Sequence, residues 1–208
     1  DRYLIDTSFW SHDMPITEII KNWVPNKSRV IDLGCGDGAL LCDLKNTKNI
    51  IGYGVEIDSD KIELCIENGV SVIEQDIDQG ISDFKSFNFD VAIMASSIQC
   101  LKKPDKALSR MLNISDQCIV TLPNFGHWKC RLDVFLGRMP VTKSLPMSWY
   151  ETDNSHLCTI KDFETLCSDR GFVLKKKKYL NKNYKESWLS SLKPNLFASE
   201  GVYLIAKD

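Results

Sequence analysis

The sequence predicts an α/β protein with a Rossmann-like, seven-stranded, mostly parallel sheet and helices on both faces. Three observations lead to this fold class. An apolar strand runs into a D-x-G-x-G-x-G turn at residues 32–38, apolar and helical segments alternate from residue 15 to residue 122, and two strand-like segments close the chain. Fully apolar strands separated by helices are typical of a buried parallel sheet covered on both sides.

The elements follow in order along the chain. Pro15 suits the first turn of a helix, Asp58 or Ser59 is suited to cap another, and Gly69 is suited to end it. We expect helices at 15–24, 38–45, 58–68, 104–112 and 160–170. We expect strands at 29–33, 49–57, 70–74, 89–95, 117–122, 172–179 and 201–206. No helix of clear period separates the last two strands, which predicts an antiparallel hairpin.

The alternation breaks at residues 123–158, which are rich in aromatic, proline and basic residues without a clear period. We therefore expect a single domain over 1–208, with an inserted cap or docking segment at 123–158. Four lysines at 175–178 fall on a predicted strand, where side chains alternate between faces. An exposed edge strand that resists aggregation explains them. A surface for an acidic partner is the alternative.

Composition narrows the class of protein. The 208 residues carry a net charge of −2, which gives no nucleic-acid signature. No apolar run approaches the roughly 20 residues of a membrane span, and no signal-peptide pattern is visible. The eight cysteines form no C-x-x-C pair, so we expect reduced thiols and a cytoplasmic protein. The three histidines lack ligand spacing, so we expect no metal site.

The glycine turn indicates the ligand class. Dinucleotide folds use G-x-G-x-x-G, whereas Gly34, Gly36 and Gly38 stand at every second position here. Asp32 precedes them, and a carboxylate there suits a cationic ligand better than a phosphate. S-adenosylmethionine (SAM) carries an amino group and a sulfonium, so SAM is favoured over NAD. We assign Asp32, Gly34, Cys35 and Gly36 to the cofactor site. Cys35 is interpreted as a small residue that fits the turn rather than as a nucleophile.

Glu56 ends the second predicted strand, 20 residues after Gly36. A carboxylate at that strand tip accepts ribose hydroxyls, and we assign it and the adjacent Ile57 to the cofactor site. A helix-capping role is the alternative, but Asp58 and Ser59 already fill it. A ribose is common to NAD and SAM, so Glu56 alone does not choose between them.

The order of elements resembles the class I SAM-dependent methyltransferase fold. That resemblance implies that Asp76 receives the adenine amino group and that Ile77 packs on the ring. It also implies that Met94, at the end of the fourth strand, lies beside the methionine moiety, with Ser96 and Gln99 as further candidates. An exposed turn acid is the alternative for Asp76, and Asp78 is close enough to be confused with it.

Several longer motifs are more selective. They are Pro-Asn-Phe-Gly-His-Trp at 123–128, Gly-Arg-Met-Pro-Val-Thr at 137–142, and His-Leu-Cys-Thr-Ile-Lys-Asp-Phe at 156–163. Together with residues 31–41 and 53–58, they resemble the MetW family of methionine-biosynthesis proteins over roughly residues 15–180. The resemblance implies a methyltransferase-like fold, a link to methionine synthesis, and association with homoserine O-acetyltransferase.

His127 is the candidate general base, because its unperturbed pKa lies near 6.5. With Trp128 and Arg138 it could belong to a lid that reads an anionic acceptor. The alternative is a rigid structural turn with the Trp128 indole in the core. His156 is interpreted as structural.

Two functions remain open. The first is a SAM-binding methyltransferase-like protein, with S-adenosylhomocysteine (SAH) as product, that transfers a methyl group to an unidentified small acceptor or acts with homoserine O-acetyltransferase. The second is a non-catalytic activator of that acetyltransferase that senses SAM or SAH. Methyl transfer from SAM often needs only positioning and desolvation, so a missing base decides nothing.

Overall fold

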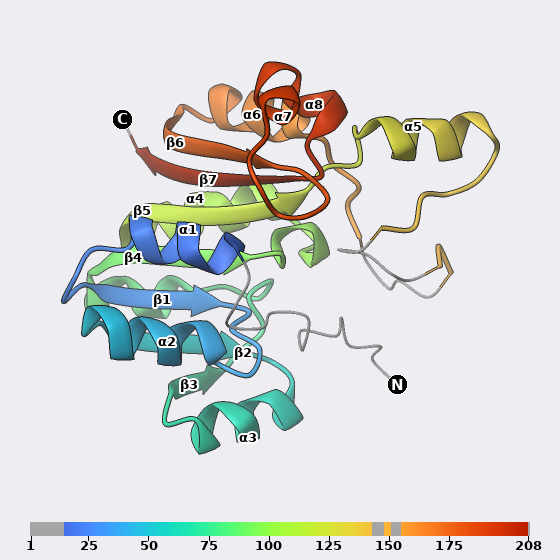
Figure 1. Ribbon diagram of the computed structural model, residues 1–208. Helices are drawn as coiled ribbons and strands as arrows, with labels where there is room; N and C mark the ends of the chain where they lie inside the picture. The colour runs from blue at the N-terminus through green and yellow to red at the C-terminus, as the bar shows by residue number, and fades with distance from the viewer. Residues whose placement is uncertain (1–14, 143–147, 151–154, 208) are drawn as a thin grey trace.

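A seven-stranded sheet organises the chain, with strand order β3-β2-β1-β4-β5-β7-β6 (Figure 1). The computed structural model describes residues 15–142, 148–150 and 155–207. The first five strands are parallel, and β7 runs antiparallel to both β5 and β6. This arrangement confirms the predicted fold class and the closing antiparallel pair. The strands are β1 (Arg29–Leu33), β2 (Ile51–Glu56), β3 (Ser71–Glu74), β4 (Phe89–Ala95), β5 (Ser115–Pro123), β6 (Phe172–Leu180) and β7 (Glu200–Lys207).

Helices cover both faces of this sheet. On one side, buried residues of α1 (Pro15–Trp23), α2 (Ala39–Lys48) and α3 (Ser59–Glu67) form a core with Val30 of β1. On the other side, α4 (Pro104–Ile114) and α6 (Ile160–Asp169) pack with the next residue of β1, Ile31. Successive strand residues point to opposite faces, so β1 contributes to both cores. The predicted continuous apolar strand is therefore explained by burial on both sides.

Three short helices were not expected from the sequence. They are α5 (Trp128–Phe135), α7 (Trp188–Leu192) and α8 (Pro194–Phe197), beside the 3-10 turns η2 (Ser82–Phe87) and η3 (Ile98–Cys100). In α5 only Cys130 is buried, and Figure 1 shows this helix projecting beyond the edge of the sheet. A helical period of apolar residues arises where one face of the helix packs on a core. Helix α5 has almost no such face, so its sequence carries no helical period.

The lysine-rich strand β6 forms one edge of the sheet, as predicted. Lys176 points toward α1, with its Nζ 6.0 Å from the centre of the Trp23 ring. Lys177 points the opposite way and pairs with Glu164 of α6 at 3.3 Å. A bulge between Leu174 and Lys176 further interrupts the edge, which hinders pairing with another strand. None of the helices in the described residues is long and apolar enough to cross a membrane.

Candidate functional site

The glycine turn lies at the carboxyl end of β1. Its first two backbone N–H groups, from Gly34 and Cys35, donate to the Val55 carbonyl of β2 at 2.8 and 3.1 Å. Gly34 and Gly36 have φ angles of 80° and 59°, a region that L-residues seldom adopt. A Cβ on Gly34 would lie 3.1 Å from the Ser97 hydroxyl, just past β4. The turn is therefore tightly held between β2 and the end of β4.

Cys35 is a buried thiol that packs this turn onto its neighbours. Its sulfur fills the space above Gly54, where a Cβ would come within 2.4 Å of it. It also lies 3.8 Å from the sulfur of Cys65 on α3, which donates to the Gly36 carbonyl at 3.0 Å. The hydrogen bond with Cys65 and burial hold the pKa of Cys35 above its ordinary value. A neutral, enclosed thiol fits the interpretation as a small packing residue.

Asp32 is a buried carboxyl group at the end of β1. It is 3 % exposed, and its Oδ1 has no hydrogen-bond partner among the described residues. Burial, with a smaller effect from the charge of Glu56, raises the pKa of Asp32 to about 7. Burying an unpaired carboxylate is costly unless a donor or cation accompanies it. The position therefore fits the amino group of a ligand such as SAM.

Glu56 links the tip of β2 to the glycine turn. Its Oε2 accepts the Gly36 N–H at 2.9 Å, and its Oε1 accepts the N–H groups of Ile57 and Asp58 at 2.8 and 3.2 Å. A carboxylate has about four acceptor positions, so these bonds leave room for about one ribose hydroxyl. Asp58 caps α3 by accepting the Asp60 N–H at 3.0 Å, as predicted. Asp58 therefore fills the helix-capping role that was the alternative for Glu56.

Asp76 and Ile77 follow β3 at the same sheet edge. Asp76 is half-buried and accepts the Asp78 N–H at 2.9 Å, so it shapes the turn. Ile77 packs against the core. Asp78 accepts the Lys102 N–H at 3.0 Å, which ties it to the start of the α4 segment. Asp76 and Asp78 line one cavity of about 290 Å³. The structure therefore places Asp76 and Asp78 side by side.

Met94 lies inside the core with 0 % exposure, packed on the α4 and α6 side. Its expected contact with the cofactor stays a prediction. Two residues later, Ser96 reaches the edge with φ at 52°, and its N–H donates to the Thr121 hydroxyl at 2.9 Å. Gln99 is 4 % exposed and donates to the Ser96 carbonyl at 2.7 Å. Ser97 donates to the Leu33 carbonyl at 3.1 Å, so the tip of β4 is bonded directly to β1.

A second pocket, of about 260 Å³, lies beside this tip and is called the Glu200 pocket here. Its lining includes His127, Lys129, Lys182 and Glu200. Glu200 is 1 % exposed and accepts a hydrogen bond from the Ser96 hydroxyl at 3.2 Å. Sequence reasoning missed Glu200, because the predicted strand began one residue later. The available signal was a single acid at the start of an otherwise apolar strand.

His127 caps α5 and faces the same pocket. Its Nδ1 accepts the Lys129 N–H at 3.3 Å, which leaves Nε2 to carry the ring proton. Burial, and then the charge of Lys129, lower the pKa of His127. The neighbouring Trp128 is 43 % exposed, so the alternative that placed its indole in the core is wrong. His156 lies outside this pocket, and its N–H donates to the Gln99 carbonyl at 2.8 Å.

Asn124 explains part of the Pro-Asn-Phe-Gly-His-Trp motif. It is 3 % exposed, and its amide donates to the Ala198 carbonyl at 2.7 Å. Its Oδ1 accepts the N–H groups of Gly126 and Ile160 at 2.9 and 3.3 Å. A Cβ on Gly126 would approach the Asn195 carbonyl to 3.0 Å, so the close packing requires glycine. These contacts make the motif a rigid joint between β5, α6 and α8.

Comparison with known proteins identifies the family. The family model described as "Methionine biosynthesis protein MetW" matches residues 15–205. The chain belongs to the MetW family. It is 26 % identical over 202 residues to the "Bifunctional methionine biosynthesis protein MetXA/MetW" of Rhodopirellula baltica. That match covers 92 % of this chain and 32 % of the relative, so the chain spans about a third of the relative's length.

Solved structures show the same fold at low identity. A SAM-dependent methyltransferase of Thermotoga maritima, titled a possible histamine N-methyltransferase, matches with a TM-score of 0.66 and 19 % identity, covering 92 % of this chain and 87 % of that one. Cyclopropane synthase MmaA2 of Mycobacterium tuberculosis gives 0.69 and 12 %, covering 96 % and 88 %. Phosphoethanolamine N-methyltransferase 2 of Haemonchus contortus, in complex with SAM, gives 0.68 and 15 %, covering 91 % and 51 %. This MetW-family chain therefore has the class I SAM-dependent methyltransferase fold.

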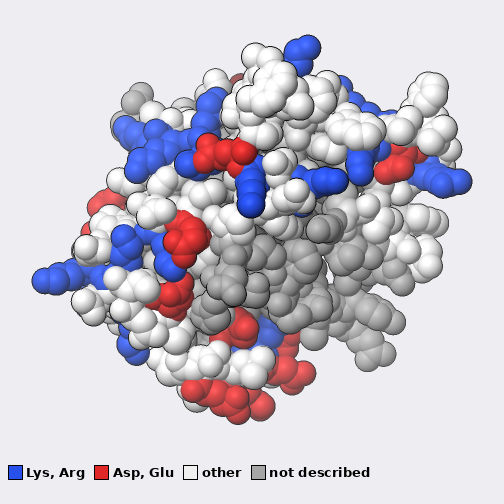
Figure 2. Space-filling view, viewed as in Figure 1, with Lys and Arg blue, Asp and Glu red and all other residues white. Residues whose placement is uncertain are grey.

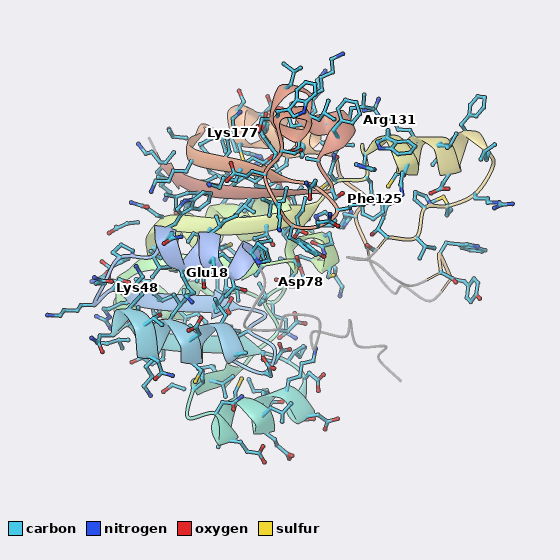
Figure 3. All side chains as sticks on the ribbon, viewed as in Figure 1. Glu18, Lys48, Asp78, Phe125, Arg131 and Lys177 are labelled. Atoms are coloured by element: carbon cyan, nitrogen blue, oxygen red, sulfur yellow. The ribbon has the colours of Figure 1, made fainter. Side chains whose placement is uncertain are left out.

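The other conspicuous surface of this MetW-family chain is apolar. Figure 3 shows Phe125 and Arg131 where the chain leaves the sheet after β5, with further side chains of α5 extending away from the sheet. In Figure 2, uncharged atoms cover the far end of this helix. We call the five residues the apolar arm: Leu132, Val134, Phe135, Leu136 and Met139, which are 46, 58, 84, 61 and 51 % exposed.

Proposed function

We propose that this protein binds SAM at the carboxyl edge of its sheet and acts with homoserine O-acetyltransferase in methionine biosynthesis. The apolar arm is the observation that carries the partnership, because five apolar side chains are exposed along one short segment of the chain. Exposed apolar residues that gather in this way mark interaction sites in soluble proteins.

The cofactor half of the proposal rests on the residues of the sheet edge. Asp32, Gly34 and Gly36 hold the amino-acid end, with Cys35 packing the turn behind them. Glu56 accepts a ribose hydroxyl beside the exposed Ile57. The remaining contacts are the adenine with Asp76 and Ile77, and the methionine chain with Met94. When bound, SAM supplies a sulfonium-activated methyl group, and SAH is what remains after its transfer.

The partner half rests on the arm and on the relative. Phe135 and Met139 belong to residue types that are enriched at protein interfaces. Phe135 ends helix α5, and Met139 follows four residues later. The Asn124 joint anchors the start of this helix to the sheet. The Rhodopirellula relative bears the names MetXA and MetW in one bifunctional protein. A homoserine acetyltransferase bound to this arm would bring an acetyltransferase and a MetW-family chain together as two separate proteins.

Co-purification with the acetyltransferase tests this arrangement. The double variant Phe135→Ser with Leu136→Ser should weaken the complex at least about tenfold, because central apolar anchors carry most interface energy. Ile66→Ser is the matched control, since Ile66 is 64 % exposed but lies on α3. Binding that survives the double variant, or that fails equally in the control, would rule out the arm as the docking surface.

A second candidate function is methyl transfer to a small acceptor. The Glu200 pocket favours it, because Ser96 and Ser97 join this pocket to the glycine turn. His127 and Glu200 then offer two groups able to take a proton from an acceptor. Release of SAH with a defined metabolite at about 1 per second or more would establish it as an enzyme. Its absence with a broad metabolite panel would leave the activator role.

A further inference from the structure

We propose that the Glu200 pocket binds a small α-amino acid, with its ammonium group on Glu200 and its carboxylate toward Lys129 and Lys182. This inference goes beyond the proposed function, because such binding requires neither methyl transfer nor docking of the acetyltransferase. It assigns to the protein a second ligand site beside the cofactor edge.

Glu200 forms the floor of this site because of sheet topology. Strand β7 runs opposite to β5, so its first residue, Glu200, pairs with Pro123 at the carboxyl end of β5. The side chain is 1 % exposed and forms no ion pair with any residue that the structure describes. The hydrogen bond that it accepts from Ser96 comes from an uncharged hydroxyl group. Burying a carboxylate without a cation costs free energy, and the ammonium group of a ligand would offset that cost.

Two lysines lie on the other lining elements, where Asp133 of α5 is the one further carboxylate among the described lining residues. Lys129 comes from α5 and Lys182 from the segment after β6. Neither lysine is ion-paired with another described residue, and Lys129 lies 5.6 Å from the centre of the Trp128 ring. An anion on the lysine side and a cation on the glutamate side match the two charges of an amino acid.

The size of the pocket limits the ligand. Its volume of about 260 Å³ falls below the roughly 300–1,000 Å³ of sites for drug-sized ligands. A small amino acid is accommodated, whereas a nucleoside cofactor is too large. Size and charge therefore separate this site from the proposed SAM site.

The serine pair connects the two sites. Ser96 adopts a φ of 52°, which is uncommon for a residue with a side chain. Its N–H bond to Thr121 and its hydroxyl bond to Glu200 hold this conformation. The next residue, Ser97, contacts the glycine turn through the Leu33 carbonyl. Strain that is held by specific bonds is common at functional sites, and here it aims Ser96 at the pocket floor.

Proton linkage gives the proposal a specific signature. Burial raises the pKa of Glu200 to about 7, although the hydrogen bonds from Ser96 and Thr121 act to lower it. Near pH 7 some of the Glu200 side chains therefore carry a proton. An ammonium group stabilises the ionised form, so binding should release protons to the buffer. The other titratable groups lining the pocket are His127, Lys129, Cys130, Asp133, Lys182 and Tyr184.

Calorimetry in two buffers of different ionisation enthalpy tests the proposal. The probes are L-homoserine, L-serine and L-2-aminobutyrate, with 4-hydroxybutyrate lacking the amine and 3-aminopropan-1-ol lacking the carboxylate. At least one amino acid should bind more tightly than about 10 mM. Glu200→Gln should weaken that binding at least about tenfold and abolish the proton release. Glu164→Gln is the control, since that carboxylate contacts Tyr179 and Lys177 on α6's side of the sheet.

A second variant covers the case in which Glu200→Gln fails to fold. Lys182→Met changes an exposed residue at the rim of the pocket. It should weaken binding of the amino acid several-fold and leave the affinity for 3-aminopropan-1-ol unchanged. Failure of all three amino acids to bind, or unchanged affinity in both variants, would overturn the proposal. SAH is titrated in parallel, so loss of the amino-acid site and loss of the cofactor site are separate results.

Discussion

Apolar residues are buried at the carboxyl edge of the sheet, where the glycine turn lies, but they are exposed in the apolar arm. At the edge, Leu33 and Cys35 are 0 and 8 % exposed, and each is enclosed by neighbouring strands or helices. In the arm, Phe135 is 84 % exposed and packs on no core. The edge is therefore complete within one chain, whereas the arm presents a surface that a partner would cover. The same contrast exists within the segment after β5, between the buried joint at Asn124 and the exposed Phe135.

The largest expected effect comes from breaking the joint. Asn124→Ala leaves the N–H groups of Gly126 and Ile160 and the Ala198 carbonyl without their side-chain partner. We expect a loss of about 3–4 kcal/mol in the free energy of unfolding, measured by urea titration. Asn195→Ala is the control: it removes one acceptor of the Lys161 N–H and should cost about 1 kcal/mol. Equal losses in both variants would contradict the role of Asn124.

A second substitution tests the edge itself. Gly36→Val should weaken SAH binding at least about 100-fold, because a β-branched residue resists the φ of 59° and disturbs the N–H bond to Glu56. Gly69→Val imposes similar strain at φ 68°, with nothing within 4 Å of its Cβ. That control should lose comparable stability but keep its affinity for SAH. Normal SAH affinity in Gly36→Val would show that the turn is not the site.

The pH dependence of stability should report Asp32. Burial raises its pKa to about 7 in the folded protein, from an ordinary value of 3.8, so the folded state binds more protons between these limits. Stability is therefore lost as the pH rises through this range, and the penalty is complete above pH 7. We expect Asp32→Asn to be more stable by about 1–3 kcal/mol at pH 8, with the gain disappearing near pH 4. Thermal melts whose difference does not change with pH would contradict this assignment.

The comparison also explains what the sequence could and could not predict. Strands β1 and β4 were predicted with their observed bounds, because burial on both faces leaves a continuous apolar run. The place of Glu56 beside the glycine turn was predictable, because its hydrogen-bond partner Gly36 is only 20 positions away in a recognisable motif. Glu200 was missed because its burial depends on Ser96, which is 104 positions away. Helix α5 was missed because its apolar residues face no core.

Calorimetric titration of SAH into the wild type, Glu56→Gln and Phe135→Ser tests the separation of edge and arm most directly. We expect a loss of about 1.5–3 kcal/mol of binding free energy in Glu56→Gln, as is typical of charge-assisted hydrogen bonds. We expect a change within about 0.3 kcal/mol in Phe135→Ser, whose side chain lies on the arm. Unchanged SAH affinity in Glu56→Gln, or an equal loss in Phe135→Ser, would contradict the separation of edge and arm.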